Sequence, residues 1–318
     1  MHLIDVFNGD ADGLCALHQL RLDEPADSEL VTGPKRDISL LKRVQAGAGD
    51  RITVLDIALS KNRDALDRLL AAGAQVRYFD HHQPGDIPVH PHFEPHIDTD
   101  ANVCTSLLVN RYLQGRHPAW AVAAAFGDNL ADAARQAAAP LGLSAEQLAQ
   151  LQSLGECLNY NGYGETLDDL FFDPADLYRQ IRPFADPFAF IAESSAYRTL
   201  KAGYQDDMAR AVAVNAADAR AAGRIFMLPA EKWARRISGV FGNRLATESP
   251  AQAHAVLTAK PDGGYLVSVR APLAAKSGAD DLCSQFDTGG GRKGAAGINH
   301  LPESELGRFI ATFFKVFG

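Results

Sequence analysis

The sequence has 318 residues, of which 47% are hydrophobic and 22% are charged, so it can form sizeable cores and is not a disordered chain. Its formal net charge is −8, whereas proteins that bind long duplexes tightly carry a basic surface. We therefore expect no tight, sequence-independent binding to long DNA. A short nucleotide, held by metal ions and a few arginines, is compatible with this charge.

The cysteines and the apolar segments indicate a compartment. Cys15, Cys104, Cys157 and Cys283 are far apart and form no CxxC pair, which excludes the usual zinc knuckle and a disulfide framework. No apolar run approaches the roughly 18 residues that a membrane-spanning helix needs. The amino terminus has neither a basic start nor a signal-type apolar stretch. We therefore expect a soluble, cytoplasmic protein with no membrane partner.

The first half of the chain alternates short apolar segments with helical patterns. Strands are predicted over residues 2–7, 51–55 and 75–79. Helices are predicted over residues 14–22, 63–72, 105–113 and 119–125, followed by a helical hairpin over 144–158. This rhythm is typical of a parallel sheet with crossover helices.

The second half changes character. Residues 160–205 contain several aromatic residues and prolines with short helical stretches, which indicates a connector. Strands over 253–258 and 265–270 around a turn, a glycine-rich loop at 289–291 and a helix over 303–317 follow. We predict an α/β protein with a parallel-sheet domain and flanking helices over 1–190, a helical connector over 191–210 and a smaller α/β domain over 211–318.

Acidic and imidazole side chains follow three successive predicted strands. In open parallel sheets, ligands bind beyond the carboxyl ends of the strands. The candidates are Asp10 and Asp12 after the first strand, Asp56 after the second, and Asp80, His81 and His82 after the third, with Asp128 after a later apolar helix. We expect these side chains to meet at one edge of the sheet.

A metal site explains this accumulation of carboxylates. Facing carboxylates repel one another unless a cation lies between them. Oxygen ligands with an imidazole suit Mn²⁺ or Mg²⁺, and two such ions about 3.5–4 Å apart can clamp a phosphoryl group. Asp10 and Asp12 can serve two ions while Ala11 points away, and Gly13 is expected to permit a tight turn before the helix.

Each motif taken alone has an ordinary explanation. A DxDG segment is often a turn or a cap of the following helix, and a strand-end Asp is usually a helix cap. Their coincidence at successive strand ends favours the metal site. Three histidines and a glutamate between prolines also look like ligands, but we expect a solvated loop there, because the segment has left the strand ends. These residues are His90, His92, Glu94 and His96.

The ordered motifs resemble the DHH phosphoesterase superfamily. The order is DxDG, a strand-end Asp, the Asp80-His81-His82 tripeptide and a later Asp. Residues 289–297, GGGRKGAAG, resemble the GGGH-xx-AAG motif of the associated DHHA1 domain, and residues 267–270 look like its preceding strand. The chain is thus similar to nanoRNase and RecJ-like members with two domains.

The resemblance implies roles for the site residues. Asp10 and Asp56 would hold one metal; Asp12, Asp56, His81 and Asp128 would hold the other. Asp80 would orient His81, and His82 would face the phosphate. A hydroxide activated by two Mn²⁺ ions, or by Mg²⁺, would attack phosphorus in line.

A second group of residues would bind substrate. The backbone of Gly289, Gly290 and Gly291 would offer N–H groups to a phosphate, as glycine-rich loops can. Two positions depart from the family pattern. Asn8 stands where some branches have a metal-binding His, and Arg292 stands where GGGH has His. Arg stays charged and binds phosphate bidentately, so we expect Arg292 to anchor a phosphate; Arg270 has either a similar role or that of a structural ion pair.

The favoured function is hydrolysis of phosphate esters in small nucleotides: short oligonucleotides, cyclic dinucleotides or 3′-phosphonucleotides. The alternatives are a single-strand 5′–3′ exonuclease of RecJ type, an inorganic pyrophosphatase and a non-catalytic nucleotide sensor. A homodimer is plausible. Residues 159–163 offer Asn and Tyr side chains that could contact a base, although turn formation and packing are the favoured explanation.

Overall fold

The computed structural model describes residues 2–318 and divides the chain into two compact units, Met1–Ala202 (unit 1) and Gly203–Gly318 (unit 2). The division falls inside helix α9 (Ser195–Val212), within the stretch expected to be a connector. Among the described residues, no helix has the length and apolar character needed to cross a membrane.

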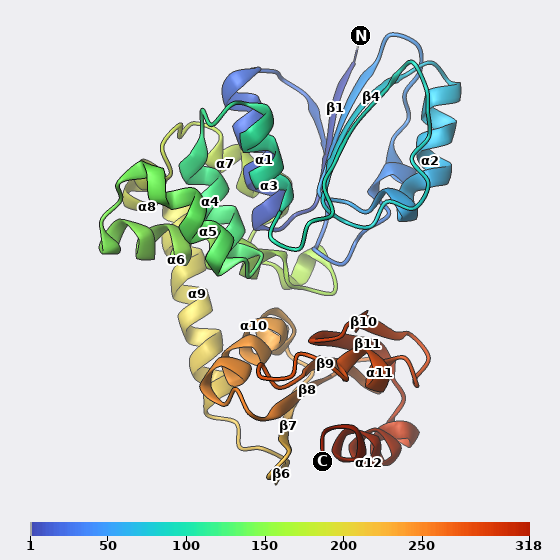
Figure 1. The fold of residues 1–318 in the computed structure, drawn as a ribbon, viewed down its shortest axis with the longest axis vertical. Helices are drawn as coiled ribbons and strands as arrows, with labels where there is room; N and C mark the ends of the chain where they lie inside the picture. Colours follow the sequence, from blue (N-terminus) through green and yellow to red (C-terminus); the bar gives the residue numbers. More distant parts are fainter. Residues whose placement is uncertain (1) are drawn as a thin grey trace. The chain divides into compact units, whose positions relative to one another are not determined.

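Unit 1 is built on a five-stranded parallel sheet with the strand order β2-β1-β3-β4-β5 (Figure 1). Its strands are β1 (Leu3–Phe7), β2 (Glu29–Val31), β3 (Arg51–Leu55), β4 (Gln75–Asp80) and β5 (Phe93–Ile97). Its α-helices before α9 are α1 (Ala11–Asp23), α2 (Leu59–Ala71), α3 (Thr105–Tyr112), α4 (Pro118–Gly127), α5 (Ala131–Ala138), α6 (Ala145–Gly162), α7 (Pro174–Ile181) and α8 (Pro187–Glu193). Short 3-10 turns are η1 (Leu40–Arg43), η2 (Ala139–Leu141) and η3 (Leu167–Asp169).

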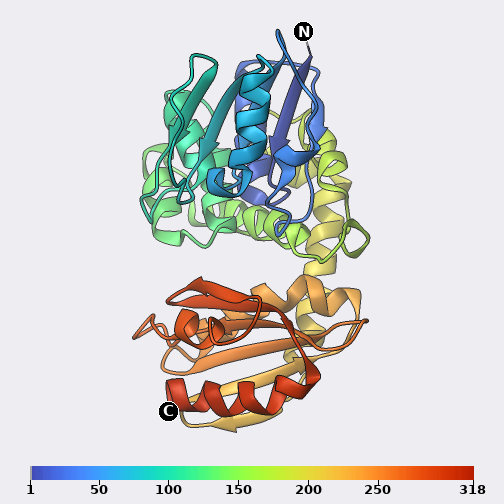
Figure 2. The same ribbon diagram turned by 90° about the vertical axis from the view of Figure 1, so that its right-hand side faces the viewer.

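Helices cover both faces of this sheet, because its strands are apolar on both sides. Helix α2 and η1 pack on one face, where Ile52, Val54 and Val76 are buried (Figure 2). The helical layer around α1, α4 and α6 packs on the other face, against Phe7 and Leu55. Two buried layers of this kind are the arrangement that a parallel sheet requires.

Two expectations about unit 1 were wrong. The predicted hairpin over 144–158 is the single helix α6, which Ser144 begins with a capping box to Gln147. The expected loop around His92 includes an edge strand, β5, which pairs in parallel with β4. There His96 lies opposite Phe79 and stacks on it at 4.5 Å between ring centroids, a cross-strand contact that stabilises the pairing.

Unit 2 is built on a six-stranded mixed sheet with the order β10-β11-β9-β8-β7-β6, in which the β7–β8 pair is parallel and the other pairs are antiparallel. Its strands are β6 (Asp218–Arg220), β7 (Gly223–Leu228), β8 (Ala253–Ala259), β9 (Tyr265–Arg270), β10 (Gly289–Arg292) and β11 (Ala295–Leu301). Its helices are α10 (Lys232–Glu248), α11 (Ala279–Cys283), η4 (Glu303–Glu305) and α12 (Leu306–Phe317). Helices α10 and α12 lie on opposite faces of the sheet (Figure 1).

The α/β class and the order of a parallel-sheet unit followed by a smaller α/β unit are confirmed. The expected glycine-rich loop is instead strand β10, with register pairs from Gly289↔Ile298 to Arg292↔Ala295. Glycine permits this close pairing, since a Cβ at Gly291 would lie 2.5 Å from the Cα of Ala296.

Candidate metal centre

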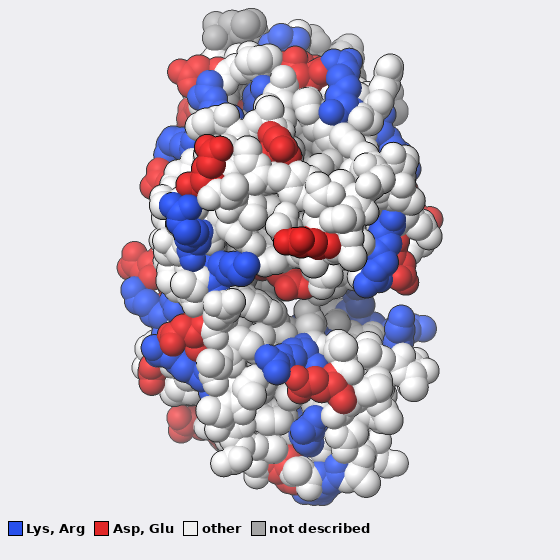
Figure 3. All heavy atoms as spheres, turned by 90° about the vertical axis from the view of Figure 1, so that its left-hand side faces the viewer, with Lys and Arg blue, Asp and Glu red and all other residues white. Residues whose placement is uncertain are grey.

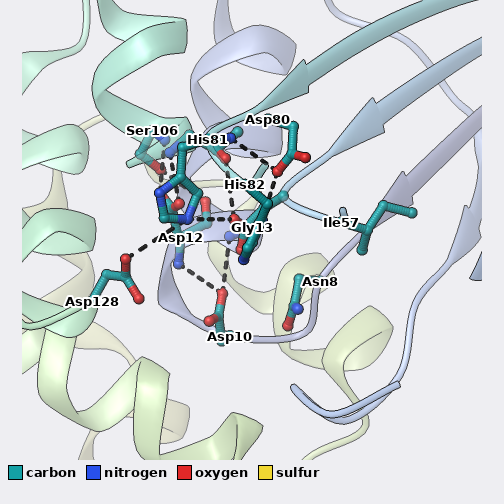
Figure 4. A network of polar contacts seen from close by, with 12 residues as sticks. Asn8, Asp10, Asp12, Gly13, Ile57, Asp80, His81, His82, Ser106 and Asp128 are labelled. Carbon is teal, nitrogen blue, oxygen red and sulfur yellow. Dashed lines mark hydrogen bonds and ion pairs between the residues drawn. The ribbon is translucent and has the colours of Figure 1, made fainter. Parts of the chain in front are cut away.

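The acidic and imidazole residues converge at the carboxyl edge of the unit 1 sheet (Figure 4). Strands β1, β3 and β4 end next to one another in the sheet, so the segments that follow them meet. Helix α4 ends at Asp128 beside them. The residues brought together are Asp10, Asp12, Asp56, Asp80, His81, His82 and Asp128.

Asp10 and Asp12 each perform a capping role as well as facing the site. Asp10 is the N-cap of α1 and accepts hydrogen bonds from the backbone N–H groups of Asp12 and Gly13, at 3.0 and 3.1 Å. Asp12 accepts from the backbone N–H groups of Thr105 and Ser106, both at 2.7 Å, and so satisfies the first turn of α3. The same carboxylates can therefore cap a helix and also bind a cation, since each oxygen keeps a further lone pair.

Gly13 has a different role from the expected one. It lies inside α1 rather than in a turn. A Cβ at this position would lie 2.1 Å from the carbonyl oxygen of Asn8, so glycine is needed for the close approach of β1 and α1. This approach sets the positions of Asp10 and Asp12 at the helix start.

Asp56 lies at the centre of the cluster in a backbone conformation that few side chains adopt. Its φ is +59°, and Thr105 Oγ1–H donates to its Oδ1 at 3.1 Å. Strain of this kind is concentrated at functional sites. Burial raises the pKa of Asp56 well above its usual range, and the charges of Asp12 and Asp10 raise it further. The cluster thus contains more negative charge than its own side chains neutralise.

His81 and Asp128 close the other side of the cluster. His81 Nε2 lies 3.5 Å from Asp56 Oδ1 and 3.9 Å from Asp128 Oδ2. Burial raises the pKa of Asp128, and the charges of Asp12 and Asp10 add to this effect, against the opposing charge of Lys35. Imidazole and carboxylate groups of this kind could together hold a divalent cation.

Asp80 contacts His82, not the ring of His81 that it was expected to orient. Its Oδ1 accepts from His82 Nδ1–H at 2.7 Å and from the backbone N–H of His81 at 2.9 Å. Burial disfavours the charged form of His82, but the hydrogen bond and charge of Asp80 outweigh this and raise its pKa. The His82 side chain is 40% exposed, so its ring can reach a ligand from solvent.

The donor set fits divalent cations that prefer oxygen and imidazole ligands. There are two groups of three residues, Asp56–His81–His82 and Asp12–His81–Asp128, and within each group the ligand atoms lie no more than 4.8 Å apart. Asn8 Oδ1 and Asp80 Oδ2 are buried acceptors with no donor among residues 2–318. Carboxylates with imidazole suit Mn²⁺ and Mg²⁺. Of the ligands expected from the sequence, Asp12, Asp56, His81 and Asp128 belong to these close groups, together with His82; Asp10 belongs to neither, and its role as a ligand stays a prediction.

One residue of the cluster was missed by the sequence analysis. Lys35 Nζ lies 2.5 Å from Asp10 Oδ2 and 3.5 Å from Asp128 Oδ1. It also donates to Asn159 Oδ1 at 3.1 Å. Burial acts to lower the pKa of Lys35, but the charge of Asp10 outweighs it and raises the pKa well above its usual range. Lys35 lies in a turn that a hydrogen bond from the Asp37 backbone N–H to the Pro34 carbonyl oxygen closes, and no motif in the sequence connects it with the cluster.

The two asparagines of residues 159–163 have different roles. Asn159 contacts Lys35 and thus belongs to the cluster. Asn161 exchanges hydrogen bonds with the backbone of Phe172, at 2.9 and 3.1 Å, which is a packing role.

The expected substrate-binding residues of unit 2 lie on its sheet. Arg292 is exposed at the end of the edge strand β10, and Gly289, Gly290 and Gly291 precede it. Arg270 is held against α10 by hydrogen bonds to Asn243 Oδ1 at 2.6 Å and to the carbonyl oxygen of Gly239 at 3.2 Å. These contacts are those of a structural side chain, whereas Arg292 is exposed.

Solved structures share this fold, whereas no protein-family model and no curated protein matches the sequence. RecJ from Thermus thermophilus, in complex with Mn²⁺, is 19% identical with a TM-score of 0.60; the match covers 98% of this chain and 51% of that chain. A manganese-bound exonuclease RecJ is 18% identical with a TM-score of 0.53, over 98% of this chain and 89% of that chain. PggH from Vibrio cholerae, a pGpG-specific phosphodiesterase, is 12% identical with a TM-score of 0.57 over the full length of both chains.

These likenesses define the class of fold. The chain has the two-unit fold of the RecJ exonucleases and of PggH, so the fold implied by its resemblance to the DHH phosphoesterases is confirmed. It spans about half the length of the Thermus RecJ.

Proposed function

We propose that this protein is a phosphoesterase that depends on two divalent cations and hydrolyses phosphate esters of small nucleotides. The observation that carries the proposal is the convergence of three buried or nearly buried carboxylates, Asp12, Asp56 and Asp128, on His81 at the carboxyl edge of a parallel sheet. Cations bound there, Mn²⁺ or Mg²⁺, would polarise a phosphoryl oxygen and activate water.

The residues around the cations supply the other parts of the chemistry. His82 reaches solvent and is held by Asp80, so it can donate a hydrogen bond or a proton to a phosphate oxygen. Asp80 is buried and keeps the His82 ring in one orientation. In unit 2, Arg292 would bind a phosphate through its guanidinium.

A small substrate is supported by two observations. PggH, a pGpG-specific phosphodiesterase, matches this chain over the full length of both. On the face drawn in Figure 3, basic side chains are interspersed with acidic ones rather than gathered into a stripe that could follow a long strand. A single-strand exonuclease is the second candidate, since the fold likeness to RecJ is as strong.

A Mn²⁺-dependent hydrolysis panel tests the proposal and separates these candidates. The panel contains a 5′-phosphorylated dinucleotide, short RNA, a cyclic dinucleotide, 3′,5′-bisphosphorylated adenosine, long single-stranded DNA and pyrophosphate. We expect the fastest turnover on a substrate of one to a few nucleotides. Turnover of long DNA alone would favour the exonuclease, and turnover of pyrophosphate alone would refute both. Mn²⁺ and nucleotide binding without turnover would indicate a sensor.

A further inference from the structure

Lys35 places a cation of the chain itself inside the proposed metal centre. Its side chain is 28% exposed, and its Nζ is 2.5 Å from Asp10 Oδ2. Asn159 Oδ1 and the ring of Tyr163, whose centroid is 5.7 Å away, surround the same ammonium group. Asn159 Nδ2–H in turn donates to the Tyr163 hydroxyl at 3.4 Å. The ammonium is therefore held in place by neighbours on several sides.

The position of Lys35 divides the cluster into two halves. Neither of the two close groups of ligand atoms includes Asp10, the carboxylate that Lys35 pairs with. Asp128 faces both halves with different oxygens: Oδ2 is directed at His81 and Oδ1 at Lys35. A divalent ion in the His81 half would thus share only Asp128 with the ammonium, whereas an ion at Asp10 would meet the ammonium directly.

Asn8 strengthens this asymmetry. Its Nδ2–H donates to the backbone carbonyl of Lys35 at 3.2 Å, which ties the Lys35 loop to the end of β1. Its Oδ1 is an acceptor that no donor of the described chain meets. Because this oxygen is neutral, it would be a weak ligand and would help a divalent ion little in displacing the ammonium from Asp10. The half of the cluster around Asp10 therefore has a resident cation and a weak additional ligand.

We propose that Lys35 makes the two cation positions unequal. The first divalent ion binds at His81, Asp12 and Asp128 with Lys35 in place. The second binds at Asp10 only when the Lys35 ammonium leaves that carboxylate. This inference rests on the proposed function, and it adds that occupancy of the second position, and with it activity, is set by competition between Lys35 and free divalent cation.

Binding of Mn²⁺ to the full-length, EDTA-treated protein tests the inference without reference to turnover. Isothermal titration of the wild type should show two steps whose dissociation constants differ by about tenfold or more, because the second ion must break an ion pair. Lys35→Gln keeps a hydrogen-bond donor but removes the charge, and Lys35→Met removes both. Both variants should strengthen the second step and bring the two constants closer. Lys61→Met, at an exposed lysine of α2, is the matched control and should leave both constants unchanged.

Thermal unfolding supplies a second measurement. Without Mn²⁺, Lys35→Met should lower the midpoint, because Asp10 loses its partner. With saturating Mn²⁺, the midpoint of Lys35→Met should equal that of the wild type measured at the same Mn²⁺ concentration. Two equal steps in the wild type, or an unchanged second step in both Lys35 variants, would overturn the inference. Two unequal steps without hydrolysis of any substrate would instead refute the proposed function and leave the inference intact.

Discussion

The crossing of α4 and α6 couples the packing of unit 1 to its metal centre. At this crossing a Cβ on Gly155 would lie 1.9 Å from the carbonyl oxygen of Ala123 and 2.8 Å from the backbone nitrogen of Gly127. Asp128 follows Gly127 directly, and Asn159 lies about one turn beyond Gly155 along α6. The substitution Gly155→Ala must therefore push apart the two helices that carry these side chains.

The size of the effect follows from the distances. Ordinary van der Waals contact begins near 3.4 Å, so the helices must separate by about 1.5 Å at this point. Overpacking of a close-packed core costs about 1–3 kcal/mol of stability. A displacement of about 1 Å of functional groups can lower the rate about a hundredfold. We expect Gly155→Ala to reduce the free energy of unfolding by about 1–3 kcal/mol and to weaken Mn²⁺ binding.

Urea unfolding followed by circular dichroism, together with Mn²⁺ titration, measures both effects. Gly47→Ala in the same unit is the control, since a Cβ there would meet nothing closer than 3.6 Å. It should leave both quantities near the wild-type values. If Gly155→Ala unfolds at the wild-type urea concentration and binds Mn²⁺ normally, the coupling of this crossing to the site is wrong.

Three further predictions concern buried polar groups. Arg21→Met leaves Asp5 fully buried without its guanidinium partner, so urea unfolding should show a loss of about 3–5 kcal/mol, and an unchanged midpoint would contradict this. Burial lowers the pKa of His18 in the folded protein to about 4. As the pH falls, this histidine is therefore protonated in the unfolded chain before it is protonated in the folded protein. Stability should fall by up to about 3 kcal/mol from pH 6.5 to 4, and His18→Gln should flatten this slope. In the metal-free protein, Asp80→Asn should lower the pKa of His82 measured by NMR; an unchanged titration would refute the contact.

The sequence was sufficient to predict the three central strands of the unit 1 sheet, β1, β3 and β4, and the convergence of their ends, but not the two edge strands, β2 and β5. Apolar segments of five or six residues that alternate with helical patterns have few other arrangements. Parallel strands bring their carboxyl ends to one edge, so the meeting of Asp10, Asp56 and His81 follows from the order of strands and motifs along the chain.

Other features depend on contacts that no local pattern encodes. Lys35 enters the cluster from a loop, and its partners Asp10, Asp128 and Asn159 are distant in the sequence. Asp80 contacts His82 instead of the His81 ring because the rotamers, rather than the spacing, decide which ring it meets. The strand β10 replaces an expected loop because pairing with β11 overrides the low strand propensity of glycine.

Restoration of activity by Mn²⁺ tests the central claim most directly. The EDTA-treated wild type and Asp56→Asn are compared on the substrate panel with and without added Mn²⁺; Asn is chosen because it tolerates the positive φ of position 56. We predict that Mn²⁺ restores hydrolysis of a small nucleotide substrate in the wild type and not in Asp56→Asn. Hydrolysis that survives both EDTA and the Asp56→Asn substitution, or the absence of hydrolysis from the Mn²⁺-loaded wild type on every phosphate ester of the panel, would contradict the account.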